Sequence, residues 1–181
     1  MACGGDKDSA AVETSYPQNG ASLYQRGDSV RGRVTVRSKT GVTERYEVVT
    51  RVGDISADLG SYRIDKIKIS QAQTIVQPSE WVSHEELSEL YFTSPEQLQA
   101  RCGEMSGRVL SLSLVDGTVT GCRVVSNWTQ SGISGGGETW LGVVPFGILK
   151  RNWSSKDGLQ KMTFETLSYI RNGVHRSLSA H

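Results

Sequence analysis

Apolar and charged residues alternate along two stretches near the start of the chain, and this alternation constrains the fold more than any other feature. Val30, Val34 and Val36 alternate with arginine and threonine residues, and residues 45–52 alternate in the same way. A period of two residues is typical of a β-strand with one face against a core and one face in water. The sequence Ser-Lys-Thr-Gly at 38–41 lies between the two stretches and predicts a hairpin.

A third strand is expected over residues 62–69. Its apolar residues change phase between Ile64 and Ile67, so that a regular strand would place them on opposite faces. We expect a β-bulge at Asp65-Lys66 to absorb this change.

A second hairpin is predicted at Asp116-Gly117, a dipeptide that favours the tight turn between antiparallel strands. With a two-residue turn, Ser111 would lie opposite Cys122, and the two side chains would share one face. The leucines of the first strand would then face the core, and Cys122 would face the other side. These leucines are Leu110, Leu112 and Leu114.

The last part of the chain returns to β patterns. Residues 131–137 form a glycine-rich break, and an apolar strand is expected after it, over 139–149. Asp157-Gly158 predicts a turn into a final strand over 159–170. Residues 174–181 are expected to form a frayed tail.

The middle of the chain carries helix signals instead. Ser83 followed by Glu86 predicts a capping box, in which the side chain of each residue accepts a hydrogen bond from the backbone N–H of the other. Ser94 followed by Pro95 predicts the N-cap of a second short helix. We therefore expect a short helical insertion around residues 83–102.

These elements predict a mainly β (α+β) fold: a curved antiparallel sheet, half-barrel or sandwich-like, with the helices over one face or end. A chain of 181 residues is long enough to bury a core as one domain. Residues 1–22 are small and polar, which favours a flexible tether. The single β-rich domain is expected over 23–173.

The charge balance argues against a nucleic-acid partner, because the net charge is only +1. The charge is uneven, since residues 24–51 are basic and residues 79–97 are acidic. We interpret the two stretches as a solvated strand face and a solvated helix face. No apolar run approaches the ~20 residues that a membrane-spanning helix needs.

Residues Met1-Ala2-Cys3-Gly4-Gly5 resemble the cleavage end of a bacterial lipoprotein signal, in which a small residue precedes a lipidated cysteine. The resemblance implies that Cys3 carries the lipid and that the protein contacts the membrane through this N-terminal anchor only. Gly4 at the position after the cysteine, with no aspartate there, implies the outer membrane of a Gram-negative bacterium. The protein would face the periplasm or the cell surface.

If Cys3 carries a lipid, Cys102 and Cys122 remain as a pair. In an oxidising compartment, such a pair predicts a disulfide that closes a loop of ~20 residues and contributes about 3 kcal/mol. The alternative is a pair of buried free thiols in a cytosolic protein.

Residues 138–150, followed by 159–169, resemble the closing strands of periplasmic half-barrel proteins related to lipoprotein carriers. The likeness lies in the run Val-Val-Pro-Phe-Gly-Ile-Leu-Lys, followed by a charged turn and a final strand. The resemblance implies a half-barrel whose concave face binds a lipid or another apolar ligand.

Four aromatic residues are candidates for contact with a ligand or a partner: Trp128, Trp140, Phe146 and Trp153. Such residues most often pack in a core or at its rim. They can also line the mouth of an apolar site or form a docking surface for a protein.

Ser134 lies between glycines, as the nucleophile of a trypsin-like protease does, and His84 and Asp116 complete the order of a triad. However, a hairpin turn would expose Asp116 to solvent, where it cannot orient an imidazole ring. His84, His175 and His181 are too dispersed for a metal site. We therefore expect no catalytic residues, no metal and no other cofactor.

The leading hypothesis is a non-enzymatic, lipid-anchored protein of the cell envelope that binds a lipid or other apolar ligand on a concave sheet face. The alternative is a structural or interaction module whose Trp128–Trp153 region docks an envelope protein. A serine hydrolase that uses Ser134 is a distant third.

Overall fold

The computed structural model describes residues 23–56, 59–114, 117–130 and 133–178. The expected tether over 1–22, which includes Cys3, lies outside these described residues. Residues 179–181 of the expected tail lie outside them as well.

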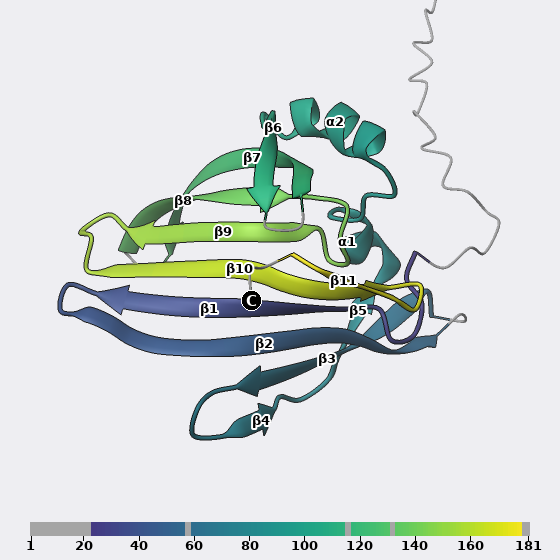
Figure 1. Cartoon of the computed structure of the whole chain (residues 1–181), viewed down its shortest axis with the longest axis horizontal. Coiled ribbons are helices and arrows are strands. Elements are labelled where there is room, and N and C mark those ends of the chain that lie inside the picture. The colour runs from purple at the N-terminus through teal and green to yellow at the C-terminus, as the bar shows by residue number, and fades with distance from the viewer. Residues whose placement is uncertain (1–22, 57–58, 115–116, 131–132, 179–181) are drawn as a thin grey trace, which may run out of the picture.

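Antiparallel strands form one open, curved sheet (Figure 1). The strands are β1 (Ser29–Ser38), β2 (Gly41–Ser56), β3 (Ser61–Ile69), β4 (Thr74–Val76), β5 (Glu80–Ser83), β6 (Arg108–Leu114), β7 (Gly117–Gln130), β8 (Ile133–Leu141), β9 (Ile148–Ser155), β10 (Gln160–Arg171) and β11 (Val174–Ser177). Their order is β4-β3-β2-β1-β10-β9-β8-β7-β6, while β5 also pairs with β3 and β11 with β10. The prediction of a mainly β fold with a curved antiparallel sheet is confirmed, and the described strands all belong to this one sheet rather than to a sandwich.

Strand β1 lies in the middle of the sheet, and its alternating sequence separates the two faces. Val34 lies directly between Tyr46 of β2 and Phe164 of β10, and only 6% of its surface is exposed. The neighbouring Arg33 lies on the opposite face, where its guanidinium is 3.9 Å from the carboxylate of Glu47. We call the face that carries Val34 the inner face and the face that carries Arg33 the outer face.

Two short helices follow β5, namely α1 (His84–Ser88) and α2 (Pro95–Glu104). The Ser83 hydroxyl accepts a hydrogen bond from the backbone N–H of Glu86, and the Glu86 carboxylate accepts one from the backbone N–H of Ser83. The Glu86 carboxylate accepts hydrogen bonds from the Ser83 backbone N–H and from the Ser83 hydroxyl, and these two bonds hold the pKa of Glu86 below its ordinary value. The Ser94 side chain caps α2 by accepting a backbone N–H of its first turn. The predicted helical insertion is therefore confirmed.

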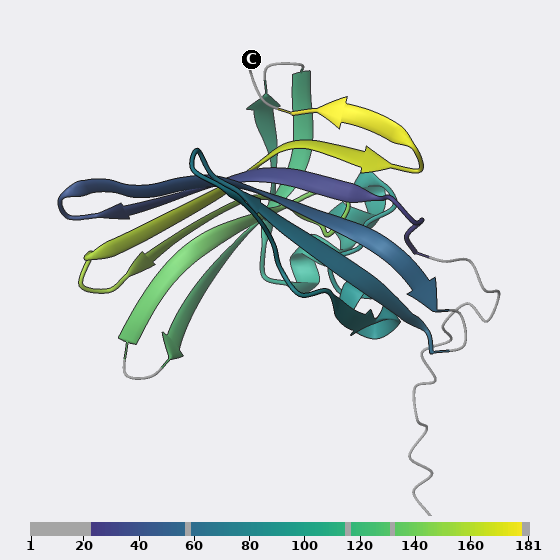
Figure 2. The same cartoon turned by 90° about the horizontal axis from the view of Figure 1, so that it is seen from below.

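The helices pack on the inner face at one end of the sheet, as Figure 2 shows. Two buried clusters join them to the strands. The first contains Phe92, Leu98, Cys102, Cys122 and Leu141. The second contains Tyr24, Val52, Tyr62 and Ile64, with Leu87 of α1 packed against it.

The second hairpin differs from its prediction in register. Val109, rather than Ser111, lies opposite Cys122. Leu110 is 40% exposed, whereas Cys122 is fully buried, so the predicted core face of this hairpin is wrong. The physical reason is that α2 covers the face that carries the cysteine, and strand alternation does not reveal which face a helix will cover.

The prediction of an unbroken strand over 139–149 is also wrong. β8 ends at Leu141, and the chain turns before β9 begins at Ile148. Phe146 and Gly147 both adopt positive φ angles, of 59° and 68°, and two successive residues in this region reverse the chain direction. The apolar side chains of the turn pack inward, which explains why the segment has the composition of a strand.

Within the described residues, 133–137 of the glycine-rich break form part of a strand. Gly135, Gly136 and Gly137 belong to β8 and pair with both β7 and β9. Gly137 has a steric reason to be glycine, because a Cβ atom there would lie 2.2 Å from the backbone oxygen of Asn152.

Two smaller predictions also differ from the structure, namely the position of the bulge and the frayed tail. The bulge lies in β2, next to Gly53, and β3 pairs regularly through Asp65 and Lys66. In the expected frayed tail, Val174–Ser177 form β11, whose backbone pairs with the end of β10.

Candidate functional site

A row of apolar side chains runs along the inner face of β1, β2, β9 and β10. Val34 lies between Tyr46 and Phe164, and Met162 pairs directly with Trp153. Apart from buried Val34, these side chains are half-buried. Figure 2 shows the β1–β2 and β9–β10 hairpins extending away from the helices. We call these five residues the apolar row.

A pocket of about 290 Å³ lies on the inner face between the sheet and α1. Its apolar walls are formed by Ile64, Val82, Leu87, Leu90, Phe146 and Ile148. Along β2, Val48 and Thr50 follow Tyr46 on the same face, and Thr50 lines the pocket. The apolar row therefore leads toward the pocket. Its size suits a small apolar ligand or one end of a longer chain.

Two lysines of β3 flank the path from the row to the pocket. Lys66 lines the pocket and forms an ion pair with Glu80. Lys68 pairs with Glu44, and its ammonium lies 3.8 Å from the ring centre of Tyr46. The hydrogen bond to Glu44 raises the pKa of Lys68. The apolar surface is thus bordered by cations that could receive an anionic headgroup.

Phe146 is the predicted candidate that the structure places in the pocket. Its ring stacks on that of Tyr24, with 5.4 Å between centroids, and its backbone N–H donates to the Tyr24 hydroxyl at 3.3 Å. Its positive φ is uncommon for a residue with a side chain, and it holds the ring toward the pocket. The next residue, Gly147, lies so close to Leu90 that a Cβ atom would be 2.1 Å from its backbone oxygen. The wall of the pocket is therefore rigidly positioned.

Tyr24 supports this wall from the buried side. It is 1% exposed, and its ring also meets Tyr91 and Tyr62 edge-on, at 4.9 and 5.7 Å. Burial raises the pKa of the Tyr24 hydroxyl well above its ordinary value, because the phenolate would lose its hydration. The hydroxyl therefore stays protonated at neutral pH.

Trp140 and Trp153 do not lie on one surface. Trp140 pairs with Lys150, whereas Trp153 pairs with Gly137, so the register places the two indoles on opposite faces of the sheet. Trp153 belongs to the apolar row of the inner face, and Trp140 lies on the outer face. Trp128 pairs with Gly135 through the backbone, and its side chain lies outside the described residues. Trp140 and Trp153 therefore cannot both contact a partner on one face of the sheet.

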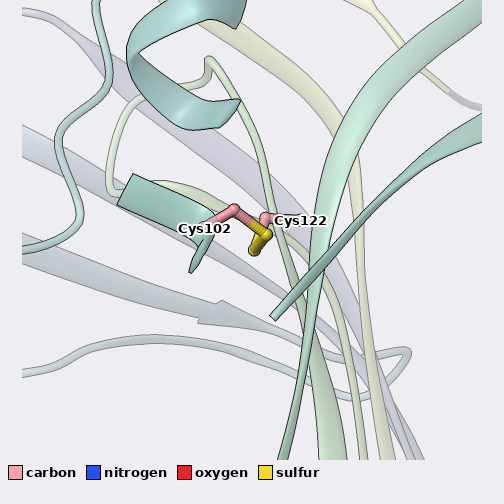
Figure 3. The surroundings of a disulfide bond; sticks show 2 residues. All are labelled: Cys102 and Cys122. Carbon is pink, nitrogen blue, oxygen red and sulfur yellow. A yellow bond between two sulfur atoms is a disulfide. The ribbon is translucent and has the colours of Figure 1, made fainter. Parts of the chain in front are cut away.

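Cys102 and Cys122 form the predicted disulfide (Figure 3). The bond ties α2 to β7, and both cysteines are almost fully buried in the first cluster. Gly107 passes so close that a Cβ atom would lie 2.5 Å from the Cys122 sulfur. The bond therefore fixes the helical end of the inner face, rather than the outer face as expected from the predicted register.

Ser134 and His84, two residues of the hydrolase alternative, are not brought together. Ser134 lies near the start of β8, and its hydroxyl is 3.1 Å from that of Thr129. His84 begins α1 at the other end of the sheet, where its Nδ1 atom is 3.3 Å from the Tyr62 hydroxyl (Figure 1). Asp116 lies outside the described residues. Within the part of the chain that the structure describes, Ser134 has no histidine as a hydrogen-bond partner, and no group of residues could hold a metal ion.

Sequence reasoning missed the lysines and the leucines of the site. Lys66 and Lys68 share a face with Ile64, and this spacing is visible in the sequence, but it was interpreted as a bulge. Leu87 and Leu90 have helical spacing, yet only the packing of α1 against the sheet makes them walls of a pocket.

No protein-family model matches the chain, and no curated protein matches it. None of the helices in the described ranges is long and apolar enough to cross a membrane. Three solved structures are similar in outline at low sequence identity.

One is a Bacteroides fragilis protein described as exported and YmcC-like in fold; it is 9% identical at a TM-score of 0.46, with 85% of this chain and 97% of that chain covered. The second, from Parabacteroides distasonis, is described as a lipoprotein. It is 9% identical at a TM-score of 0.44, and the match covers 85% of this chain and 98% of that chain. The third is a chain of the Pseudomonas aeruginosa MucA/MucB complex. It is 12% identical at a TM-score of 0.40, and the match covers 86% of this chain and 54% of that chain. Because these identities and TM-scores are low, the likeness carries no argument about function.

Proposed function

We propose that this protein is a non-enzymatic protein of the cell envelope that binds a lipid or acyl chain on the inner face of its sheet. The observation that carries the proposal is the continuity of the apolar row with the apolar pocket beside α1. The row takes the hydrocarbon chain, and the pocket takes its end beside Phe146. Burial of an apolar chain there is favourable by about 25 cal/mol for each Å² removed from water.

The two lysines suit a ligand with an anionic head. Lys66 and Lys68 already hold carboxylates, those of Glu80 and Glu44, at the border of the apolar surface. A phosphate or carboxylate headgroup can compete with these side chains for the two ammonium groups, because Glu80 and Glu44 are exposed enough for water to solvate them when they are displaced. An amphipathic ligand therefore fits the site better than a hydrocarbon without a headgroup.

The envelope location rests on the cysteines. A buried disulfide is typical of a protein that folds in an oxidising compartment. The resemblance of the sequence around Cys3 to a lipoprotein cleavage site supports a lipid anchor there, and Gly4 supports the outer membrane. Incorporation of a labelled fatty acid that disappears in the Cys3→Ala variant tests the anchor.

The ligand site is tested with a pair of variants on adjacent residues. Met162→Glu places a charge in the apolar row, and Thr163→Glu places the same charge on the outer face, one residue further along β10. We expect gently purified protein to carry lipid that organic extraction and mass spectrometry detect. Met162→Glu should lower this lipid at least tenfold, and Thr163→Glu should leave it unchanged. A clean unliganded mass for the unaltered protein, or equal loss in both variants, contradicts the proposal.

A further inference from the structure

Two hairpin tips lie side by side at the end of the sheet away from the helices (Figure 1). Ser38 ends β1 and pairs with Gly41 across the first tip and with Gln160 at the start of β10. The turn between β1 and β2 is therefore a direct neighbour of the turn between β9 and β10.

Each tip exposes a large apolar side chain. Val42 is 57% exposed at the first tip, and Leu159 is 46% exposed at the second. A single exposed apolar residue is ordinary on a protein surface, but two on adjacent tips form a small apolar projection.

Cations surround this projection. Arg37 lies directly opposite Lys161 in the β1–β10 register, and Arg45 lies diagonally across from Arg37 on the same face. Like charges directly opposite each other destabilise a sheet, so this arrangement is unfavourable until an anion binds. Among the described residues, none of these three takes part in a salt bridge.

The acidic groups nearby are already engaged. The Asp157 carboxylate accepts hydrogen bonds from the Ser155 hydroxyl and the Leu159 backbone within its own turn. Glu44 is paired with Lys68. Lys39 is attracted to the Asp157 carboxylate, so the excess of cations at the tips comes from Arg37, Arg45 and Lys161.

Exposed apolar residues ringed by cations fit the interface of an anionic lipid bilayer better than a nucleic acid or an acidic protein surface. The apolar side chains enter the headgroup region, and the cations approach the phosphates. We propose that the two tips dock on an anionic phospholipid surface through Val42 and Leu159, with Arg37, Arg45 and Lys161 supplying the attraction. This contact would be in addition to the anchor at Cys3, and it does not depend on the inner-face ligand.

The test is co-sedimentation of the unlipidated chain with vesicles of phosphatidylcholine, with and without phosphatidylglycerol. We expect binding only to the vesicles that contain phosphatidylglycerol, and weaker binding as salt screens the charges. Each cation at such a surface contributes about fivefold to the partition coefficient, so Arg37→Gln with Arg45→Gln should weaken binding by ~25-fold.

The matched control removes the same charge at the other end of the sheet. Arg26 and Arg176 are exposed, the first before β1 begins and the second opposite Tyr169 near the end of β10. Arg26→Gln with Arg176→Gln should change binding less than twofold. Val42→Ser with Leu159→Ser should weaken binding and leave its salt dependence unchanged.

Absence of binding to phosphatidylglycerol vesicles at low salt overturns the proposal. Equal weakening by the two arginine pairs overturns it too, because net charge alone would then explain the attraction. None of these variants alters the apolar row. The proposed binding of lipid on the inner face is therefore tested by a separate measurement, and its outcome does not depend on the membrane contact.

Discussion

The disulfide offers the sharpest test of how the helical end is held on the sheet. Cys102 and Cys122 are separated by 20 residues, and their Cα atoms are 5.7 Å apart. Both are buried against Leu98 and Leu141, so reduction changes no surface group. We predict that reduction leaves the sheet folded and lowers its stability. The perturbation is therefore a loss of covalent constraint with little change in native packing.

The magnitude follows from the length of the closed loop. A loop of ~20 residues restricts the unfolded chain by about 3 kcal/mol in the chain-entropy model. In a domain of this size, each kcal/mol shifts the melting temperature by about 3 °C, so we expect a decrease of ~10 °C on reduction.

The assay is thermal and urea unfolding of a Cys3→Ser chain with and without reductant, with thiol titration to confirm each state. A variant with both Cys102→Ala and Cys122→Ala is the control, since its unfolding should not respond to reductant. Equal melting temperatures for the oxidised and reduced chains would refute the entropic argument. If reductant lowers the melting temperature of the control variant by the same amount, the reductant itself, rather than the loss of the disulfide, causes the effect.

Two further outcomes are expected from the pocket wall. Gly147→Ala should cost ~3 kcal/mol or more in urea unfolding, because the new Cβ atom would meet the Leu90 backbone oxygen at a φ of 68°. Gly158→Ala, at the same φ with open space around it, should cost only about 1 kcal/mol; equal costs would contradict the steric argument. For Tyr24, the raised pKa means that its contribution to stability is complete below the unfolded value of 10.0 and is lost as pH rises above it. Tyr24→Phe should therefore flatten the alkaline loss of stability in a pH series, and an unchanged slope would contradict this cause.

Local signals in the sequence predicted the elements whose structure is decided locally. Ser83 and Glu86 form their capping box within one turn, and the hairpin at 38–41 closes between neighbouring strands. The strand alternation around Val34 also holds, because one face of β1 meets the aromatic residues of its neighbours. Each of these depends on residues that are close in the chain or that repeat regularly.

The remaining features depend on contacts between distant parts of the chain. The packing of α2 decides that Cys122, and not Leu110, is buried. The apolar turn that contains Phe146 has the composition of a strand because its residues pack against Tyr24, which lies more than a hundred positions away. Of the aromatic candidates from the sequence, Phe146 lines the pocket and Trp153 lies on the inner face, whereas the positions of the lysines and leucines around them became apparent only in the folded sheet.

The pairing of β1 with β10 has a consequence for the order of assembly. The second partner of β1 begins at Gln160, so one edge of β1 has no neighbour until more than a hundred further residues have been made. Pairings between such distant segments form slowly, and an unpaired strand edge readily joins another chain. The pairing of β1 with β10 must therefore come late, and a chain that still lacks β10 depends on being kept apart from its copies.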